Sequence, residues 1–559
     1  LLFKKILQGK PKGNVLLQVL VPAQGIQQTF SALSGILKTA RLENPRILGQ
    51  VIAVRKEDSI ENMVTKVQAN SRCPEDQQIR YEGDQRLVAS FEEIIKVEKD
   101  QTIPWKNGGV YLITGGAGGL GLIFAKEIVE KEKDVTLILT GRSDLSKEKK
   151  ARLDELERLG AKIEYKSVDV SDKKAVNALV LEIQNNSGGL NGIIHSAGVI
   201  RDNFILKKTK AEFEQVLAPK VEGVMNLDHA AKELDLDFFV LFSSGAGVTG
   251  SIGQADYSTA NAFMDAFSKY RNSLLDSRQR RGQTLSINWP LWRDGGMGID
   301  ETAEEMMKES MGMVAMETSS GIEAFYQALV SRESQVVVMK GLLEKMKSLL
   351  LSDKFDIKPD SNKTSISKAE DGLPDQASSP LCPIDPKMLK ERTLHQLKGL
   401  FGEMIKLSAS KIDPEEPFES YGIDSFMITQ MNQRLESVFG EISKTLFYEY
   451  QTLVELTDYL IANYSQVCTQ WAGIQEQTKL GQPSSILEKS LSRQPFEGEN
   501  PTRHSTEVKT GQSRGFTGAM GRNRAQEPIA VIGMSGRYPQ AKKSGRILGK
   551  LKIRQELHC

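Results

Sequence analysis

Four polar residues in the middle of the chain have side chains that could take part in proton transfer. Ser244 ends an apolar, strand-like run, and Tyr257 follows 13 residues later. Asn261 comes four residues after Tyr257, so the two side chains share one face of a helix, one turn apart. Lys220 lies 24 residues before Ser244. A tyrosine that gives up a proton, a cation that favours its phenolate and a serine that hydrogen-bonds a carbonyl oxygen suit the reduction of a ketone.

A glycine-rich turn follows a predicted strand at residues 110–114 and opens a predicted helix. The turn reads Thr114, Gly115, Gly116, Ala117, Gly118, Gly119, Leu120 and Gly121. Glycines permit a tight turn and the close approach of a pyrophosphate, and a helix start offers unpaired N–H groups to phosphate oxygens. A tight strand-to-helix loop without a ligand is the alternative. The placement between a strand and a helix favours a dinucleotide site.

The end of the next predicted strand distinguishes between the two nicotinamide dinucleotides. An enzyme that uses NAD usually places an acidic residue there, which binds the 2′-hydroxyl of the ribose. This chain has Arg142 and Ser143 instead. A guanidinium and a hydroxyl suit a 2′-phosphate, so the sequence predicts NADPH. A solvated surface arginine is the alternative for Arg142.

The combination of Ser244, Tyr257 and the residue four positions after the tyrosine resembles the short-chain dehydrogenase/reductase family. That family has a lysine where this chain has Asn261, and here a lysine stands upstream, at Lys220. This exchange is typical of the ketoreductase domains of modular polyketide synthases. Segments 168–170, 195–198 and 289–292 match the same domains. The resemblance covers residues 1–345.

The resemblance implies a role for each of these residues. Tyr257 would donate the proton, because Lys220 would lower a phenol pKa that is otherwise about 10, and Lys220 would also contact the cofactor ribose. Ser244 would hydrogen-bond the carbonyl oxygen, and Asn261 would hold a water molecule of the proton relay. The expected cofactor contacts are Thr114, Gly115, Gly116, Gly118, Gly119, Leu120, Gly121, Arg142, Ser143, Asp169, Val170, Ser196, Ala197 and Gly198. Taken singly, a core tyrosine, a helix-capping serine and a surface lysine are the alternatives.

A short segment after Gly198 bears on the configuration of the product. In the related ketoreductases, an Asp in the third place of a Leu-Asp-Asp-like triad accompanies D-hydroxyl products. The triad here is Ile200, Arg201 and Asp202, so only the last Asp is kept. Products of the opposite hand go with a Trp eight residues before the tyrosine, and this chain has Thr249 there. Both features predict a D-hydroxyl product, with Asp202 as the stereocontrol residue.

A second motif is centred on Ser425, which follows Asp424 and precedes a predicted helix with one apolar stripe. The stripe consists of Met427, Ile428, Met431, Leu435, Val438 and Phe439. Asp-Ser before a helix is by itself usually an N-cap. Residues 390–465 resemble acyl carrier proteins, which implies 4′-phosphopantetheine on Ser425, attached by a phosphopantetheinyl transferase. The net charge of this segment is −5, which suits docking on basic surfaces, although a solvated helix face has the same sign.

The elements that must position these motifs follow from the hydrophobic pattern. Strands alternate with helices over residues 108–340, which indicates an α/β fold with a doubly wound parallel sheet of the Rossmann-like type. The predicted strands are 110–114, 135–139, 162–168, 192–195, 238–242, 284–288 and 335–338. Residues 14–98 predict a smaller α/β sheet, with strands at 14–21 and 47–54 and a helix at 28–41. The carrier segment predicts a small all-α domain of four helices.

The composition varies along the chain and predicts its division into domains. The expected parts are a partial structural subdomain of the ketoreductase (1–105), its catalytic NADPH-binding domain (106–345), a linker (346–386), the carrier domain (387–466), a disordered linker (467–526) and a truncated β-ketoacyl synthase N-terminus (527–559). Ser, Asp, Lys and Pro dominate the first linker, and Gly and Arg recur in the second. The resemblance to a β-ketoacyl synthase stops after residue 540, and a reading-frame error would explain this.

The overall composition argues against several classes of protein. The 559 residues include 73 Lys and Arg and 72 Asp and Glu, and the net charge of +1 argues against nucleic-acid binding. No apolar run is long enough to span a membrane. The four cysteines are far apart, which argues against disulfides and metal clusters and favours a reducing cytosol. We therefore expect a cytoplasmic protein without a metal site.

The sequence as a whole predicts an excerpt of a modular polyketide synthase that reduces a carrier-bound β-ketoacyl thioester. Its first residues lack a start Met and a signal pattern, as an excerpt would. Expected partners are the upstream and downstream modules, including a ketosynthase. An acyltransferase acting in trans is compatible, because the G-x-S-x-G segment at 511–515 lies in Gly/Arg-rich sequence without a strand before it. The alternatives are an inactive reductase fold that only supports the carrier, and a free-standing reductase of small ketones.

Overall fold

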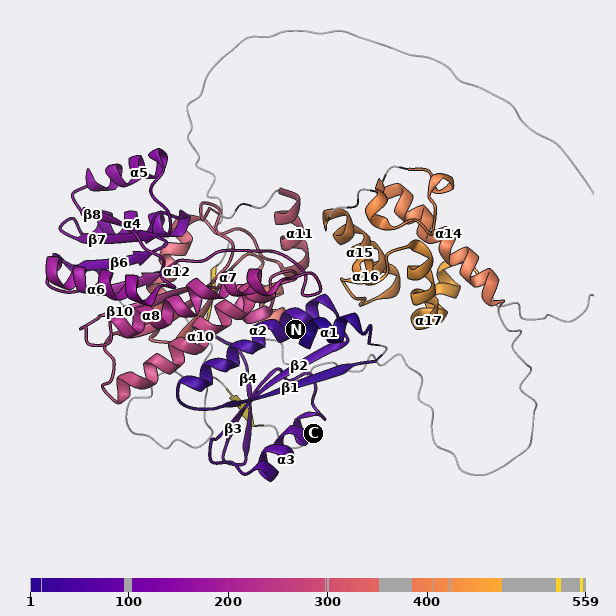
Figure 1. The fold of residues 1–559 in the computed structure, drawn as a ribbon, viewed down its shortest axis with the longest axis horizontal. Helices are drawn as coiled ribbons and strands as arrows, with labels where there is room; N and C mark the ends of the chain where they lie inside the picture. Colours follow the sequence, from indigo (N-terminus) through magenta and orange to yellow (C-terminus); the bar gives the residue numbers. More distant parts are fainter. Residues whose placement is uncertain are drawn as a thin grey trace, which may run out of the picture.

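The computed structural model describes residues 2–11, 13–94, 103–296, 298, 301–350, 385–405, 407–421, 423, 425–474, 529–533 and 553–555. These residues form two α/β subdomains and one helical domain (Figure 1). We refer to residues 2–89 as the N-terminal subdomain, to 103–350 as the central subdomain and to 385–474 as the helical domain. Most of the two predicted linkers and of the predicted β-ketoacyl synthase start lies outside the described residues.

A nine-stranded sheet forms the centre of the molecule, in the order β5-β13-β12-β11-β10-β9-β6-β7-β8. Its parallel strands are β6 (Val110–Thr114), β7 (Thr136–Gly141), β8 (Lys162–Ser167), β9 (Gly192–His195), β10 (Phe238–Ser244), β11 (Gln283–Trp289) and β12 (Gln335–Lys340). The strand order reverses between β6 and β9. Ligands of doubly wound sheets bind at such a switch point, beyond the carboxyl ends of the strands. The predicted doubly wound parallel sheet is confirmed.

Helices cover both faces of this sheet (Figure 1). The helices of the central subdomain are α4 (Gly119–Lys131), α5 (Lys147–Glu157), α6 (Lys173–Ser187), α7 (Lys210–Lys220), α8 (Glu222–Ala230), α9 (Gly245–Thr249), α10 (Ala255–Asp276), α11 (Glu301–Met311), α12 (Thr318–Ser331) and α13 (Leu343–Leu350). Successive strand residues face opposite sides, so Tyr111 and Ile113 enter one hydrophobic core and Val110 and Leu112 enter the other. The two cores fix the positions of the strands, and the polar residues of the site lie near the ends of these strands.

The N-terminal subdomain contains a second sheet, in the order β1-β2-β3-β4-β14. Its elements are α1 (Leu2–Gln8), β1 (Val15–Pro22), η1 (Ile26–Ala32), α2 (Leu33–Glu43), β2 (Ile47–Val54), α3 (Ile60–Asn70), β3 (Gln78–Glu82) and β4 (Gln85–Ala89). A Cβ on Gly35 of α2 would lie 2.5 Å from the carbonyl oxygen of Ser258 on α10, so this glycine allows the two helices to touch. The N-terminal subdomain therefore packs against the helix that contains Tyr257.

The predicted helix at residues 28–41 differs from the observed structure. A 3-10 helix, η1, comes first, and the α-helix begins only at Leu33. Of the apolar residues at helical spacing in this segment, Phe30 and Leu33 are 57% and 36% exposed, whereas Leu37 is buried. The buried face of α2 is the one that contacts α10 and β2. Which face is buried therefore depends on tertiary contacts and cannot be predicted from the local sequence.

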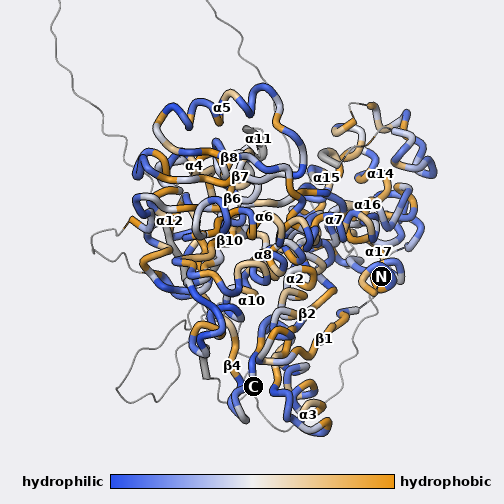
Figure 2. The backbone as a smooth tube through the Cα atoms, turned by 60° about the vertical axis from the view of Figure 1, so that its left-hand side comes forward, coloured by the Kyte–Doolittle hydropathy of each residue, from blue (hydrophilic) through white to orange (hydrophobic). Residues whose placement is uncertain are grey.

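The helical domain has a core of its own. Its elements are α14 (Pro386–Ile405), η2 (Ala409–Lys411), η3 (Phe418–Tyr421), α15 (Ser425–Phe439), α16 (Leu446–Glu449) and α17 (Leu453–Trp471). Leu397 and Phe401 of α14 pack in one cluster with Met431 and Leu435 of α15 and with Leu456 of α17. Figure 2 shows hydrophobic and hydrophilic residues alternating along these helices. The predicted small all-α domain is confirmed, and the apolar stripe of α15 faces its core.

Two short strands from the C-terminal part of the chain extend the two sheets. β13 (Ile529–Gly533) pairs antiparallel with β12 and with β5 (Glu92–Glu93). β14 (Ile553–Gln555) pairs antiparallel with β4. Nothing in the local sequence of 529–533 predicts the place of β13 in the central sheet. Among the described residues, no helix combines the length and the apolar character needed to cross a membrane.

Candidate active site and carrier serine

The glycine-rich turn connects β6 to α4 at the switch point of the central sheet. Gly115 has a φ of 67°, and a Cβ there would lie 3.0 Å from the backbone of Ala197. A Cβ on Gly119 would lie 2.2 Å from the carbonyl oxygen of Gly295. Gly118 is the N-cap of α4 and has no side chain that could cap the helix. The first N–H groups of α4 are therefore left for a ligand and suit a phosphate.

A cavity of about 220 Å³ connects this turn with the predicted catalytic residues. Its lining includes Gly115, Gly118, Gly119, Leu120, Ser196, Gly198, Lys220, Ser244, Tyr257, Trp289 and Trp292. A larger cavity, of about 770 Å³, lies between the N-terminal sheet and α10, and none of the predicted catalytic residues lines it. The smaller cavity is the candidate active site, because it joins phosphate-binding backbone to titratable side chains.

Tyr257 and Lys220 lie close together at this cavity. The Lys220 Nζ atom is 5.7 Å from the centre of the Tyr257 ring. Burial raises the pKa of Tyr257 above its ordinary value, although hydrogen bonds with Ser244 and Asn261 oppose this effect. Burial lowers the pKa of Lys220 to about 7, against the attraction of Asp265. The pKa of Tyr257 is therefore raised, opposite to the expected direction, because desolvation outweighs the hydrogen bonds that favour its phenolate.

The segment after β9 shapes the back of the cavity. A Cβ on Gly198 would lie 2.9 Å from the Lys220 Cε atom, so the absence of a side chain there makes room for the lysine. The Lys220 Nζ atom also donates a hydrogen bond to the carbonyl oxygen of Phe242 at 3.0 Å. His195 is buried, its Nδ1 atom lies 2.8 Å from the Thr114 hydroxyl, and burial lowers its pKa to about 3. His195 is thus a packing residue in this structure.

Ser244 and Asn261 both contact Tyr257 but have different further partners. Ser244 is the N-cap of α9, and its Oγ atom accepts a hydrogen bond from the Ala246 N–H at 3.3 Å. The capping alternative is thus observed, yet the same hydroxyl lines the cavity and can still donate its proton. The Asn261 Nδ2 atom donates to the Tyr257 carbonyl at 2.7 Å. The buried Asn261 Oδ1 atom has no hydrogen-bond partner among the described residues, and an unpaired buried acceptor suits the expected water molecule.

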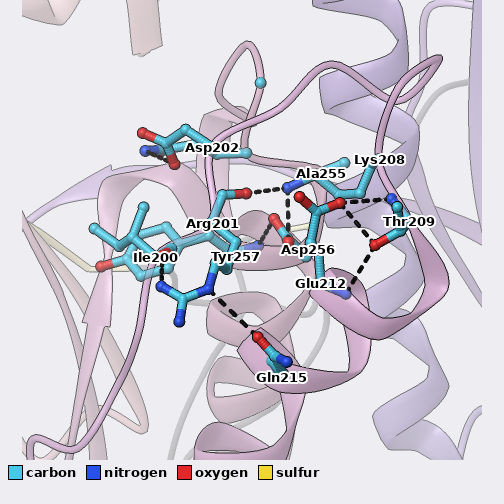
Figure 3. A network of polar contacts seen from close by, with 12 residues as sticks. Ile200, Arg201, Asp202, Lys208, Thr209, Glu212, Gln215, Ala255, Asp256 and Tyr257 are labelled. Atoms are coloured by element: carbon cyan, nitrogen blue, oxygen red, sulfur yellow. Dashed lines mark hydrogen bonds and ion pairs between the residues drawn. The ribbon is translucent and has the colours of Figure 1, made fainter.

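A buried ion pair beside Tyr257 was not predicted from the sequence (Figure 3). The Lys208 Nζ atom lies 2.7 Å from Asp256 Oδ2, and only 4% and 1% of the two side chains are exposed. Lys208 also donates to the Arg201 carbonyl. The other Asp256 oxygen accepts from the Tyr257 N–H at 2.9 Å. The pair joins residues 200–208, which we call the loop 200–208, to the start of α10, and a single Lys and a single Asp far apart in sequence give no pattern that predicts it.

The predicted residues at the ends of β7 and β8 lie at the same edge of the sheet. Arg142 and Ser143 directly follow β7 and are exposed. Asp169 accepts a hydrogen bond from the Ser171 N–H at 2.9 Å, and Val170 is buried. The exposure of Arg142 leaves open both the 2′-phosphate contact and the solvated-surface alternative.

Comparisons with known proteins agree with this geometry. Residues 109–294 match the family model described as KR domain, and residues 395–460 match the model described as phosphopantetheine attachment site. The crystal structure of a ketoreductase domain from the bacillaene assembly line is 46% identical to this chain, with a TM-score of 0.60. The match covers 62% of this chain and 84% of that chain. This chain belongs to the polyketide synthase family.

Two curated relatives match the polyketide synthase chain over nearly its whole length. They are the polyketide synthases PksL and PksN of Bacillus subtilis (strain 168), 43% and 40% identical over 98% and 96% of this chain. The chain spans only 12% and 9% of the length of these relatives. An N-terminal ketoreductase from the macrolactin assembly line is 36% identical over 62% of this chain and 68% of that chain, with a TM-score of 0.53.

The N-terminal and central subdomains of the polyketide synthase chain thus form a ketoreductase, and the helical domain is its phosphopantetheine carrier. Ser425 is the first residue of α15 and lies within the matched attachment-site region. Its side chain and the preceding Asp424 lie outside the described part of the structure. The ketoreductase unites Lys220, Ser244 and Tyr257 at one cavity, whereas Ser425 belongs to a separate domain.

Proposed function

We propose that the ketoreductase uses NADPH to reduce a β-ketoacyl thioester held by the carrier, giving a β-hydroxyacyl thioester of D configuration. The cavity lined jointly by the glycine-rich turn, Lys220, Ser244 and Tyr257 is the observation that supports this most. The backbone of the turn and the start of α4 would hold the phosphates of the cofactor. Its nicotinamide would supply the hydride that forms the new C–H bond.

The side chains at the cavity manage the proton that the new alcohol needs. The Ser244 hydroxyl donates a hydrogen bond to the carbonyl oxygen and stabilises the negative charge that develops there. Tyr257 gives its phenolic proton to that oxygen, so the carbonyl becomes a hydroxyl and the tyrosine a phenolate. The ammonium of Lys220 stabilises the phenolate. A water molecule at the unpaired Oδ1 atom of Asn261 returns the proton to Tyr257.

The position of Asp202 supports the proposed configuration. Asp202 lies on the loop 200–208, and its Oδ1 atom accepts a hydrogen bond from Gln254 Nε2 at 3.0 Å. Its charge is close enough to Tyr257 to contribute to raising the pKa of that residue. A side chain fixed on one side of the proton donor restricts the direction from which the acyl chain enters. We therefore assign Asp202 to stereocontrol.

The carrier chemistry defines the proposed partners. A phosphopantetheinyl transferase would attach the arm to Ser425. Ketosynthases of the upstream and downstream modules would supply the β-ketoacyl chain and accept the reduced one, and an acyltransferase in trans would load the extender unit. The much greater length of PksL and PksN supports such neighbours.

The proposed function is tested on the whole chain, with a β-ketoacyl group loaded on its carrier by a phosphopantetheinyl transferase. We expect NADPH to convert the loaded group to the D-β-hydroxyacyl form, read by mass spectrometry and by chiral analysis after hydrolysis. Absence of any reduction would support the inactive-scaffold alternative. An L product would leave ketoreduction standing and refute the role of Asp202.

Replacement of Arg142 is expected to discriminate between the two dinucleotides. Only NADPH has a 2′-phosphate, and a hydrogen bond to a charged group contributes roughly 1.5–3 kcal/mol. Arg142→Ala should therefore weaken NADPH binding by about that amount and leave NADH binding nearly unchanged, as measured by nicotinamide fluorescence titration. The control is Arg152→Ala, which removes an exposed arginine from α5. Equal losses for both cofactors in Arg142→Ala would contradict the contact.

The rate of reduction is expected to depend on the protonation of Lys220. Its pKa is lowered to about 7, so the ammonium is present below that pH and is lost as the pH rises through it. We expect the single-turnover rate of the wild type to fall above about pH 7, since the phenolate then loses its stabilising charge. Lys220→Gln should be slower and should lack this fall. The same fall in Lys220→Gln would assign it to another group.

A further inference from the structure

In the described part of the chain, the carrier contacts the ketoreductase at a small surface, which we call the carrier interface. On the carrier it consists of Ser443, Lys444, Tyr448, Tyr450, Tyr459 and Asn463. On the ketoreductase it consists of Lys10, Glu43, Arg46, Phe204 and Lys207. Figures 1 and 2 both place α15, which begins with Ser425, on the side of the carrier that is nearer the central subdomain.

Hydrogen bonds fix one part of the carrier interface. The Lys444 N–H donates to the Glu43 carbonyl at 2.8 Å, and the Ser443 hydroxyl donates to the same oxygen at 3.3 Å. The Arg46 guanidinium donates to Asn463 Oδ1 at 3.0 Å. The carrier residues come from the loop before α16 and from α17. These bonds join the end of α2 to two elements of the carrier.

Three cations of the ketoreductase lie against tyrosine rings of the carrier. The Lys207 Nζ atom is 4.4 Å from the centre of the Tyr448 ring, and the Phe204 ring is 5.0 Å from the same ring. Lys10 lies 4.3 Å from the centre of the Tyr450 ring, and the Arg46 guanidinium carbon is 5.8 Å from the centre of the Tyr459 ring. Basic residues on this side complement a carrier segment of net charge −5.

The carrier interface is connected to the loop 200–208 at two places. Phe204 and Lys207, which contact the carrier, belong to the loop itself. Glu43 provides the second connection, because its carbonyl binds the carrier while its buried carboxylate accepts from the Ile205 N–H at 2.9 Å and the Gly253 N–H at 3.1 Å. The far end of the loop is held by Lys208, which pairs with Asp256 next to the proton donor (Figure 3).

We propose that the carrier of this chain docks on the carrier interface during reduction, and that its contacts hold the loop 200–208 in position beside Tyr257. The proposal rests on the proposed function, since it concerns how the carrier-bound substrate meets the active site. Docking lowers the freedom of the arm at Ser425, and the ordered loop defines one side of the entrance. A carrier-bound substrate would then gain from the restricted arm and from the ordered entrance through which the arm passes. An untethered thioester has no arm and does not depend on where the carrier lies.

The contact between Lys207 and Tyr448 allows a double-mutant test in the whole chain. Tyr448→Ala removes both the cation and the ring contact, and we expect about a tenfold lower single-turnover rate with the carrier-bound substrate. Lys207→Ala removes the cation alone, and we expect about a threefold loss. The double variant should be no slower than Tyr448→Ala, because both changes remove the same contact. Reduction of a small untethered thioester should change less than about twofold, because it does not use the arm at Ser425 and because Lys208 and Asp256 still hold the end of the loop beside Tyr257.

Amide hydrogen exchange of the same variants measures how firmly the loop 200–208 is held, independently of catalysis. The Ile205 and Gly253 N–H groups, which bind the Glu43 carboxylate, should exchange faster in Tyr448→Ala than in the wild type. The matched control is Lys210→Ala, which removes an exposed lysine three residues beyond Lys207 whose ion pair is with Glu214 rather than with the carrier. The control should leave the exchange and both reduction rates unchanged.

The outcomes separate the docking proposal from the proposed function. Unchanged exchange together with wild-type reduction of the carrier-bound substrate in Tyr448→Ala would overturn the docking proposal. Strictly additive losses in the double variant would also overturn it, since the two residues would then act independently. If the wild type reduced neither substrate, the proposed function would fail, while the exchange comparison would still decide whether the carrier holds the loop.

Discussion

Replacement of Tyr257 by Phe is expected to lower the rate of β-ketoacyl thioester reduction by about 10²–10⁴-fold, the range typical of general-acid catalysis. The variant keeps the ring, and with it the packing of α10, but loses the phenolic hydroxyl at the active-site cavity. The developing charge on the substrate oxygen then has a hydrogen-bond donor in Ser244 but no proton donor. The measurement is single-turnover reduction of the carrier-bound substrate, with nicotinamide absorbance as the readout.

The effect of Tyr257→Phe must be separated from a general effect of removing a buried hydroxyl. Tyr326→Phe is a matched control, because the Tyr326 hydroxyl donates to Glu127 at 2.7 Å and accepts from Trp105 Nε1 at 2.9 Å, and Tyr326 does not line the active-site cavity. This control should reduce substrate at nearly the wild-type rate. Turnover of Tyr257→Phe within a few-fold of the wild type, with the fold intact, would refute Tyr257 as the proton donor.

Local patterns sufficed to predict the framework of the ketoreductase. Short apolar runs predicted the buried strands β6 and β9 with the observed bounds, because a strand covered on both faces is rich in apolar residues and lacks the alternation of a half-exposed strand. The glycine-rich turn was also predicted from the sequence, because a phosphate-binding turn requires glycines at fixed positions between a strand and a helix. The stripe of α15 was predicted because one face of that helix meets the carrier core.

Features that depend on distant contacts were not predictable in the same way. The ion pair of Lys208 and Asp256 forms because the loop 200–208 folds back onto α10, and nothing near either residue signals it. Glu43 binds the carrier through its carbonyl oxygen and the N–H groups of Ile205 and Gly253 through its carboxylate. These contacts form only where distant segments of the chain meet. The direction of the Tyr257 pKa shift could not be predicted from the sequence either, because it depends on how far burial outweighs the hydrogen bonds that favour the phenolate.

Buried charged and polar groups are concentrated around α10. Asp265 is buried behind the active site, where it accepts from the Ser286 hydroxyl at 2.6 Å and from Asn288 Nδ2 at 2.8 Å, and burial raises its pKa. A buried carboxylate is costly unless hydrogen bonds compensate, and these partners compensate it. Asp265 also attracts Lys220 and opposes the fall of its pKa. The helix that contains Tyr257 is therefore supported by polar contacts on the same side as the chemistry.

Replacement of Ser425 by Ala is expected to abolish reduction of the carrier-bound substrate, because the arm that would hold the β-ketoacyl group has no other attachment point in the proposed function. Tethering within one chain typically raises the local substrate concentration to about the millimolar range, so its loss is a large effect. A small untethered thioester should be reduced at nearly the wild-type rate, since Ser425 lies in the carrier and not at the active-site cavity. Intact-protein mass spectrometry measures loading, and nicotinamide absorbance measures reduction.

The control for this variant is Ser437→Ala, which removes an exposed serine from the same helix. Among the described contacts, the Ser437 hydroxyl donates only to the Arg434 carbonyl within that helix. Ser437→Ala should be loaded and should reduce its substrate like the wild type. Loss of the untethered reaction in Ser425→Ala would mean that this serine supports the fold or the reductase chemistry, and the carrier assignment would fail. Continued loading of Ser425→Ala would instead place the arm on a different serine and leave the coupling of carrier and ketoreductase intact.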